Sequence, residues 1–400
     1  MNHLNETPRG SRLHIAIFGR RNAGKSSLIN ALTEQKISIV SDVPGTTTDP
    51  VFKSMEILPL GPVVLIDTAG IDDEGELGVL RVEKTISVMK KTDLAIVVID
   101  LEKGFGLFEE EIINKANEEK IPVILVSNKS DKYTQNEEIN FQDIPHIFVS
   151  CLTGQGIDEL KFAMIKHAPK DWTAPTIIGD LVSPGDTVVL VIPIDLAAPK
   201  GRLILPQVQT LRDILDNDCM AMVVKERELK AALSGLAKKP SLVITDSQAF
   251  LKVDADTPKD IRLTSFSILF ARYKGDLKTM VEGAEAIRNL VPGDKVLIAE
   301  ACTHHKQEDD IGTVKIPRWL RQIVGGDLEF EWTSGIQLPE DLGKYRLIVH
   351  CGACMINRKE MLYRIEVAKQ AGVPIVNYGV LISFVHGILN RAISPFKNIL

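Results

Sequence analysis

The sequence has few aromatic residues, no excess of positive charge and no long apolar run, and each shortage disfavours a class of protein. Aromatic residues make up 5% of the chain, which leaves few platforms for stacking single-stranded nucleic acid. The formal net charge of −6 and the pI of about 5.8 disfavour a general nucleic-acid binder. A membrane-spanning helix needs a run of about 18 apolar residues, and the chain has none, so we expect no membrane span.

Cysteine is also scarce, and its placement matters more than its number. Five cysteines do not make a disulfide scaffold. The polar segment Met1–Arg12 lacks the apolar run of a signal peptide, so we expect a cytoplasmic protein. Three of the five cysteines, Cys302, Cys351 and Cys354, lie close in sequence to His304 and His350.

The pattern of strands and helices predicts an α/β fold in three domains. A single hydrophobic core stops growing near about 250–300 residues, and this chain has 400. Strand-length apolar runs alternate with helices from Leu13 to His167, which indicates a buried, mainly parallel sheet. A segment with two prolines, 168–175, then marks a boundary. We expect domains at 1–170, 176–263 and 264–400.

The middle domain shows no group of residues typical of catalysis. It opens with a turn, Ser183–Asp186, and a strand, Thr187–Pro193. Its cysteine, Cys219, lies among methionines and alanine and is interpreted as a small buried hydrophobic residue. In the last domain, by contrast, the predicted strands Lys295–Ala299 and Tyr345–His350 each run into cysteines.

A phosphate-binding loop follows the first predicted strand. Residues 19–26 fit G-x-x-x-x-G-K-S and open a helix, which is the context that this motif requires. Backbone N–H groups of such a loop surround the β-phosphate, the lysine reaches the β- and γ-phosphates, and the serine holds Mg²⁺. The candidate nucleotide-binding residues here are Gly19, Asn22, Ala23, Gly24, Lys25, Ser26 and Ser27.

Four further elements follow in the order found in GTPases. Residues 44–49 supply a switch threonine, and residues 67–70 place Asp67 at a strand end, where its carboxylate can hold Mg²⁺ through water. Asn128-Lys129-Ser130-Asp131 follows a buried strand, and its terminal carboxylate can accept two hydrogen bonds that guanine offers and adenine does not. Ser150 and Cys151 can place a backbone N–H near guanine O6. The set predicts a GTPase using Mg²⁺, with catalytic candidates Lys25, Thr47, Asp67 and Gly70.

These elements resemble the Era and tRNA-modification (TrmE) branch of small GTPases. The resemblance implies that Thr47 joins Ser26 as a Mg²⁺ ligand, and that Asn22 binds an activating K⁺ beside the phosphates. Such a K⁺ would take the place of an arginine finger in the transition state. Ile71 stands where Ras-like enzymes carry glutamine, so intrinsic hydrolysis should be slow. The residue that positions the attacking water stays open.

The last domain carries the pattern C-x-H-x45-H-C-x-x-C. Its cysteines and histidines lie at the carboxyl ends of predicted strands, where distant segments of an α/β sheet meet around a shared crevice. On spacing alone, a tetrahedral zinc site and an iron–sulfur cluster are equally favoured. With only three cysteines, a cluster would keep one iron on a weaker, exchangeable ligand.

The combination of this GTPase domain, a middle domain and the terminal cysteine pattern resembles the HydF family of FeFe-hydrogenase maturation factors. The resemblance covers essentially the whole chain and implies a dimeric scaffold with a 4Fe-4S cluster on Cys302, Cys351 and Cys354. His304 and His350 would ligate the fourth iron, contact a di-iron precursor, or support the site through hydrogen bonds. The implied partners are radical-SAM maturases, which help to make the precursor, and the apo-hydrogenase that receives it. The middle domain would mediate dimerisation.

Two other functions compete with this one. The GTPase branch also favours an RNA- or ribosome-associated GTPase with a zinc-stabilised C-terminal domain, although the acidic charge balance makes nucleic acid an unfavoured partner. An open iron site would also suit a redox or lyase enzyme regulated by GTP, but no substrate-binding pattern lies near the cysteines.

Overall fold

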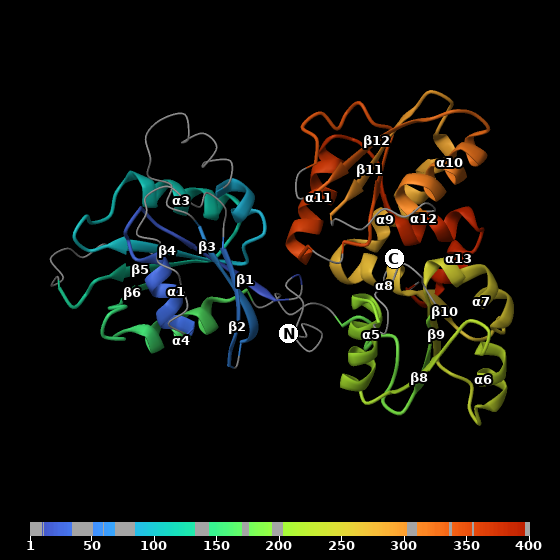
Figure 1. Cartoon of the computed structure of the whole chain (residues 1–400), viewed down its shortest axis with the longest axis horizontal. Coiled ribbons are helices and arrows are strands. Elements are labelled where there is room, and N and C mark those ends of the chain that lie inside the picture. Colours follow the sequence, from blue (N-terminus) through green and yellow to red (C-terminus); the bar gives the residue numbers. More distant parts are fainter. Residues whose placement is uncertain are drawn as a thin grey trace. The chain divides into compact units, whose positions relative to one another are not determined.

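The chain folds as two compact α/β units, Met1–Thr173 and Ala174–Leu400, in the computed structural model shown in Figure 1. The structure describes residues 10, 12–33, 51–58, 60–68, 85–132, 144–169, 176–193, 203–301, 310–335, 338–353 and 356–396. Among these residues, no helix has the length and apolar character needed to cross a membrane.

The first unit is built on a six-stranded sheet in the order β2-β3-β1-β4-β5-β6, in which only β2 runs antiparallel to its neighbour. Strands β1 and β4 are buried along their whole length, because helices cover both faces of the sheet. The prediction of a buried, mainly parallel sheet is confirmed. The strands are β1 (Leu13–Phe18), β2 (Val51–Ile57), β3 (Gly61–Asp67), β4 (Leu94–Asp100), β5 (Val123–Asn128) and β6 (His146–Phe148).

Two hydrophobic cores lie on opposite faces of this sheet. Helices α1 (Lys25–Thr33) and α4 (Ile157–His167) pack their buried side chains against one face. Helix α3 (Leu107–Glu118) packs against the other. This arrangement leaves the carboxyl edge of the strands, where β1 leads into α1, for the loops that carry chemistry.

The second unit contains two parallel sheets with the same connectivity, ordered β10-β9-β7-β8 and β12-β11-β13-β14. In each, the first strand lies between the second and the third, so the strand order reverses between the first and third strands. The strands are β7 (Thr187–Val191), β8 (Met220–Val224), β9 (Leu242–Thr245), β10 (Leu263–Ser265), β11 (Lys295–Glu300), β12 (Glu329–Ser334), β13 (Leu347–His350) and β14 (Ile375–Asn377).

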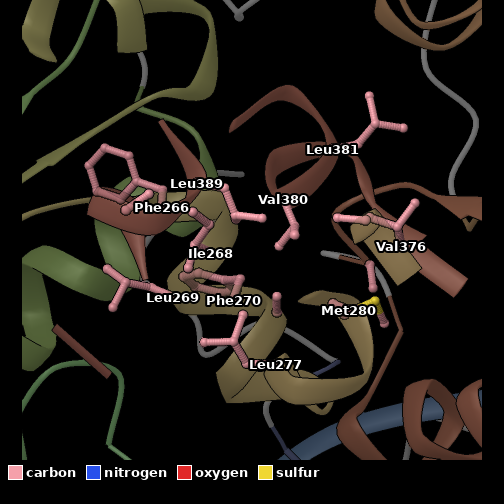
Figure 2. Close-up of a cluster of buried hydrophobic side chains, with 14 of the residues drawn as sticks. Phe266, Ile268, Leu269, Phe270, Leu277, Met280, Val376, Val380, Leu381 and Leu389 are labelled. Atoms are coloured by element: carbon pink, nitrogen blue, oxygen red, sulfur yellow. The ribbon is translucent and has the colours of Figure 1, made fainter. Parts of the chain in front are cut away.

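A continuous cluster of buried side chains joins the two sheets, with helices α8, α9 and α12 between them (Figures 1 and 2). Phe266, Met280 and Val380 are among the side chains at its centre, each no more than 1% exposed. The helices of this unit are α5 (Leu205–Asp216), α6 (Leu229–Gly235), α7 (Phe250–Asp256), α8 (Phe266–Lys274), α9 (Leu277–Ala286), α10 (Ile316–Val324), α11 (Arg358–Gln370), α12 (Tyr378–Val385) and α13 (Leu389–Ala392).

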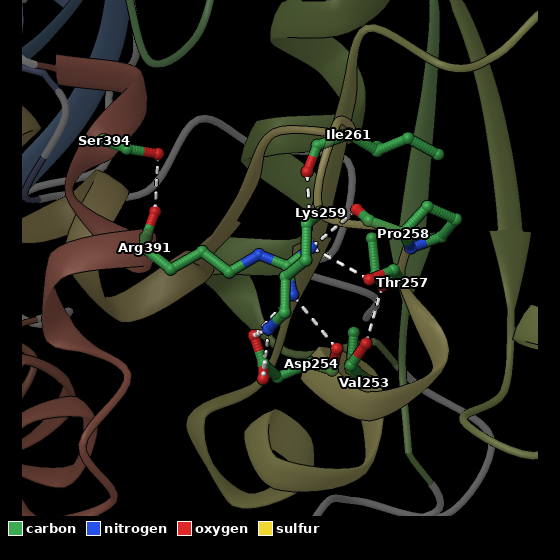
Figure 3. A network of polar contacts seen from close by, with 8 residues as sticks. All are labelled: Val253, Asp254, Thr257, Pro258, Lys259, Ile261, Arg391 and Ser394. Carbon is green, nitrogen blue, oxygen red and sulfur yellow. Dashed lines mark hydrogen bonds and ion pairs between the residues drawn. The ribbon is translucent and has the colours of Figure 1, made fainter.

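Arg391 ties the last helix, α13, to the loop after α7 (Figure 3). Its guanidinium donates to the carboxylate of Asp254 and to backbone carbonyls of Asp254, Thr257, Pro258 and Ile261. Partial burial opposes ionisation of Asp254, but hydrogen bonds from Arg391 and Lys259 outweigh that effect and lower the pKa of this carboxyl below its usual value. Arg391 therefore links α13, which follows β14 and α12 in the chain, to the segment that leads from α7 to β10.

The stability that Asp254 contributes should disappear in acid. Because its pKa is lowered in the folded state, the contribution is present above the unfolded pKa of about 3.9 and is lost as pH falls through the folded value. We expect Asp254→Asn to lower the free energy of unfolding by about 1–3 kcal/mol at pH 7. Urea unfolding followed by tryptophan fluorescence measures this, since Trp319 and Trp332 lie in the second unit.

Asp256→Asn is the matched control on the same helix, since the pair of Asp256 with Lys252 is solvent-accessible. An Asp254→Asn effect that stays constant from pH 7 to pH 3 would contradict the ion-pair interpretation.

Candidate functional site

The loop between β1 and α1 curls tightly because of its two glycines. Gly19 has φ +154°, and a Cβ there would lie 2.5 Å from the carbonyl oxygen of Val98. Gly24 has φ +93°, and a Cβ there would lie 2.1 Å from Nδ2 of Asn128. Asn22 also takes a positive φ, 64°, and its side chain is exposed. Only glycine fits at the first two positions, which explains the fixed glycines of the motif.

Lys25 and Ser26 lie where the loop becomes helix. The Lys25 side chain is buried, and its Nζ donates to the carbonyl oxygens of Gly19 and Arg20 at 2.6 and 2.9 Å. Its ammonium group is therefore held over the loop that is expected to surround phosphate. Ala23 is also buried in this loop, whereas Ser27 is exposed on the first turn of α1.

Asp67, at the end of β3, lies beside Ser26. Ser26 Oγ donates to Asp67 Oδ2 at 2.7 Å, so the structure brings together the two side chains predicted to serve Mg²⁺. Burial raises the pKa of the Asp67 carboxyl, against the opposing effects of the Ser26 hydrogen bond and the nearby Lys25 charge. The two other predicted catalytic residues, Thr47 and Gly70, lie outside the described residues.

The predicted base-recognition residues also converge. The buried Asn128 donates to the carbonyl of Ala23 at 3.0 Å and accepts the Lys129 N–H at 2.8 Å. Ser150 Oγ donates to Asp131 Oδ1 at 2.6 Å, which orients the carboxylate expected to read guanine. Burial raises the pKa of the Cys151 thiol to about 11, and the Cys151 backbone N–H donates to Asn128 Oδ1 at 3.4 Å.

Two buried acids support this site, although the sequence did not predict a role for either. Asp100, at the end of β4, accepts from Lys129 Nζ at 2.6 Å. Glu109, 1% exposed on α3, accepts from the Arg20 guanidinium and from the Gly106 N–H at 3.0 Å. A signal existed for Asp100, since an acid that ends a buried strand needs a partner. The sequence contains no such signal for Glu109, because a glutamate in the first turn of a helix is ordinary.

Cys351 directly follows β13, next to the point where the last sheet reverses its strand order between β11 and β13. Ala299 is the register partner of His350, and the Cys351 N–H continues this ladder to the Ala299 carbonyl at 2.9 Å. The Ala301 N–H donates to Cys351 Sγ at 3.2 Å. The residue before Cys302 is thus in contact with the thiol of Cys351, although the two cysteines are 49 positions apart.

His350 is fully buried, and both of its ring nitrogens bind protein groups. Nε2 lies 2.9 Å from Arg364 Nη1, and Nδ1 lies 2.8 Å from the carbonyl oxygen of Cys351. A guanidinium only donates and a carbonyl only accepts, so Nδ1 carries the proton. Arg364 is itself 1% exposed and is paired with Glu360. In this arrangement His350 orients the backbone of Cys351.

Lys274, the last residue of α8, supports the other end of the cysteine loop. It is 1% exposed, and its Nζ donates to the carbonyl oxygens of Ala353 at 3.1 Å and Ile356 at 2.9 Å. These carbonyls flank Cys354 in the sequence. Ala353 has φ 54°, a conformation unusual for alanine, so the loop needs such support.

These features fit a thiolate-bound metal group. An N–H···S bond, as from Ala301, is typical around cluster cysteines, and the buried ammonium group of Lys274 would offset part of the negative charge of several thiolates. Cys302, His304 and Cys354 lie outside the described residues. Within the described ranges, no three Cys, His, Asp or Glu side chains come together as a metal site.

Comparisons with known protein families give a match for each of the two units, Met1–Thr173 and Ala174–Leu400. The family model "50S ribosome-binding GTPase" matches residues 14–129, so the first unit is a GTPase domain. The second unit matches "Hydrogen maturase F dimerization domain" over residues 177–275 and "Hydrogen maturase F tetramerization domain" over residues 278–395. The chain belongs to the hydrogen maturase F (HydF) family. The predicted resemblance and fold class are therefore confirmed.

Curated relatives match the GTPase part of this HydF-family chain. GTPase Der of Kosmotoga olearia is 34% identical over 189 residues, 43% of this chain and 42% of the relative. The tRNA modification GTPase MnmE of Nitrosomonas europaea is 33% identical over 161 residues, 39% of this chain and 35% of the relative. The chain thus spans about two fifths of the length of these relatives. The solved G domain of the T. maritima FeoB iron transporter has 26% identity and a TM-score of 0.31, covering 39% of this chain and 98% of the G domain.

Asp131→Asn should weaken GTP binding selectively. The change replaces the carboxylate that Ser150 orients and that is expected to accept two hydrogen bonds from guanine. We therefore expect GTP affinity to fall about tenfold to a hundredfold. Titration with a fluorescent GTP analogue measures this. Asp158→Asn, an exposed acid on α4, is the control, and equal affinities for the two variants would contradict the assignment.

Lys274→Met should loosen the cysteine loop without affecting the GTPase unit. The Ala353 and Ile356 carbonyls lose a buried donor, and we expect iron affinity to fall about tenfold, as for other groups that orient ligands. Iron retained against a chelator measures this, with Lys278→Met, exposed on α9, as the control. Equal iron retention in both variants would show that Lys274 is not needed to hold the loop.

Proposed function

We propose that this chain is a GTP-hydrolysing scaffold that binds a 4Fe-4S cluster on Cys302, Cys351 and Cys354 and delivers a di-iron precursor to apo FeFe-hydrogenase. The observation that carries the proposal is the Ala301 N–H bond to Cys351 Sγ where the last sheet reverses its strand order, in a chain that also has a GTPase domain. Membership of the HydF family supports it.

The GTPase residues have distinct roles in this proposal. Lys25 neutralises phosphate charge, Asp131 reads guanine, and Asn128 holds the base and phosphate loops together through Ala23. Ser26 and Thr47 would hold Mg²⁺, which supplies charge stabilisation at the β- and γ-phosphates when bound. Asn22, exposed at the turn of the loop, would hold K⁺. Hydrolysis would release the switch segments.

Iron chemistry and nucleotide chemistry have separate residues in this proposal. The three cysteines provide thiolates, while His350 orients Cys351 and His304 contacts the cluster or its cargo. The boundaries 1–170, 176–263 and 264–400 would separate a GTPase domain, a dimerisation domain and a cluster domain in a cytoplasmic homodimer or a higher oligomer. Radical-SAM maturases and the apo-hydrogenase would dock in response to the nucleotide state.

A zinc-stabilised, ribosome-associated GTPase is the second candidate function. The match of residues 14–129 to a ribosome-binding GTPase family favours it. One tightly bound zinc ion without sulfide, together with salt-sensitive RNA binding, would support this function instead.

Iron, sulfide and zinc analysis of anaerobically reconstituted protein tests the proposal. We expect about four irons and four sulfides per chain. Cys302→Ala should lose the cluster, whereas Cys219→Ala, a buried cysteine of the middle region, should keep it. Lys25→Ala should abolish GTP hydrolysis and keep the iron, because the two sites share no residue. Loss of iron in Lys25→Ala would contradict the separation of the sites.

A further inference from the structure

The segment between β4 and α3, residues 100–109, carries a buried acid at each end. Asp100 is the last residue of β4 and is 4% exposed, and Glu109, in the first turn of α3, is 1% exposed. Burying a carboxylate is costly unless a charged or hydrogen-bonding partner compensates it. Each acid has such a partner, and the two partners lie on different loops of the nucleotide site.

Glu109 contacts the phosphate loop, residues 19–26, through Arg20. The Arg20 guanidinium donates to Glu109 Oε2, which also accepts the Gly106 N–H at 3.0 Å. The guanidinium lies against Gly106, where a Cβ would be 2.2 Å from Arg20 Nη2. The backbone carbonyl of the same arginine accepts Lys25 Nζ at 2.9 Å. The position of Arg20 therefore affects the carbonyl that orients Lys25.

Asp100 contacts the base loop, residues 128–131, through Lys129. Lys129 Nζ donates to Asp100 Oδ2 at 2.6 Å, and the Glu102 N–H donates to Asp100 Oδ1 at 3.1 Å. One carboxylate oxygen thus binds the base loop, and the other binds the segment itself. Lys129 has φ 69°, a left-handed conformation that favours glycine, so the base loop needs support at this residue.

The middle of the segment is held in the core of the first unit. Phe105 and Phe108 are partly buried and pack against the hydrophobic core on the α3 side of the sheet. The segment therefore forms a second connection between the two loops, beside the direct bond from Asn128 Nδ2 to the Ala23 carbonyl at 3.0 Å. A nucleotide with its phosphates on one loop and its base on the other binds well only when the spacing of the loops is right.

We infer that residues 100–109 hold the phosphate loop and the base loop at the spacing that a guanine nucleotide requires, with Asp100 and Glu109 as positioning residues. Each acid acts through a cation of a nucleotide loop. The inference rests on the GTPase part of the proposed function and does not involve the cluster. Because the spacing is set before the nucleotide binds, the affinities for GDP and GTP depend on it equally, whereas the rate of hydrolysis of bound GTP does not.

Asp100→Asn and Glu109→Gln, made singly and together in the full-length protein, test this inference. Titration with fluorescent GDP and GTP analogues measures the two dissociation constants, and phosphate release at saturating GTP measures hydrolysis. Each single change frees one end of the segment, so we expect both dissociation constants to rise about tenfold and saturated hydrolysis to stay at the wild-type rate. A segment freed at one end no longer sets the spacing, so the double variant should bind only as weakly as the weaker single variant.

Glu111→Gln is the matched control, because Glu111 pairs with Lys115 on the exposed side of the same helix. It should bind both nucleotides like the wild type. Losses of affinity that multiply in the double variant would show two independent supports and overturn the inference. A lower rate of saturated hydrolysis with unchanged affinities would overturn it as well.

Gly106→Ala keeps the test valid if Glu109→Gln does not fold. Gly106 has φ −153°, which alanine also adopts, and the added Cβ would displace the Arg20 guanidinium without removing a charge. We expect the same loss of affinity for GDP and GTP, and wild-type affinity in Gly106→Ala overturns the inference while the proposed function stands. A wild type that binds neither nucleotide overturns the inference and the proposed GTPase roles together.

Discussion

Neighbouring strands of a parallel ladder end at the same edge of the sheet, and both candidate sites of this chain depend on that constraint. In the first unit it brings Asp67, Asp100 and Asn128 to the edge where the phosphate loop begins. In the last sheet it brings Ala301 to Cys351. Without this register, segments about 50 to 80 residues apart in sequence would not share a site.

Charged groups taken out of water must be compensated, and the compensation shapes both sites. Lys25 and Lys274 are buried ammonium groups that donate to backbone carbonyls of a loop. Glu109 and Arg364 are buried within ion pairs. Lys25 and Lys274 each hold a loop in one conformation, whereas Arg364 holds the side chain of His350. Support for the functional loops therefore comes from the interior of each unit.

The second unit combines two sheets of the same connectivity in one hydrophobic core. The family matches divide it near residue 276, next to helix α8, whose apolar side chains belong to the shared core. Lys274 at the end of that helix contacts the cysteine loop, and Arg391 contacts the loop after α7. Lys274, which lies in the region that matches the dimerisation model, thus contacts the backbone of the loop that follows β13.

The sequence by itself determined the elements whose residues are consecutive. A short segment largely specifies its own backbone geometry, and this was enough to predict the phosphate loop, the Asn128–Asp131 motif and the buried strands. The spacing of the cysteines is read directly from the sequence. Tertiary structure alone decided the contacts between distant segments. Lys274 meets Ala353 across 79 positions, and Arg20 meets Glu109 across 89. His350 reads as a ligand in the motif, yet in the fold both of its nitrogens bind protein groups. Packing between distant segments creates these partnerships, and no short stretch of the sequence specifies it.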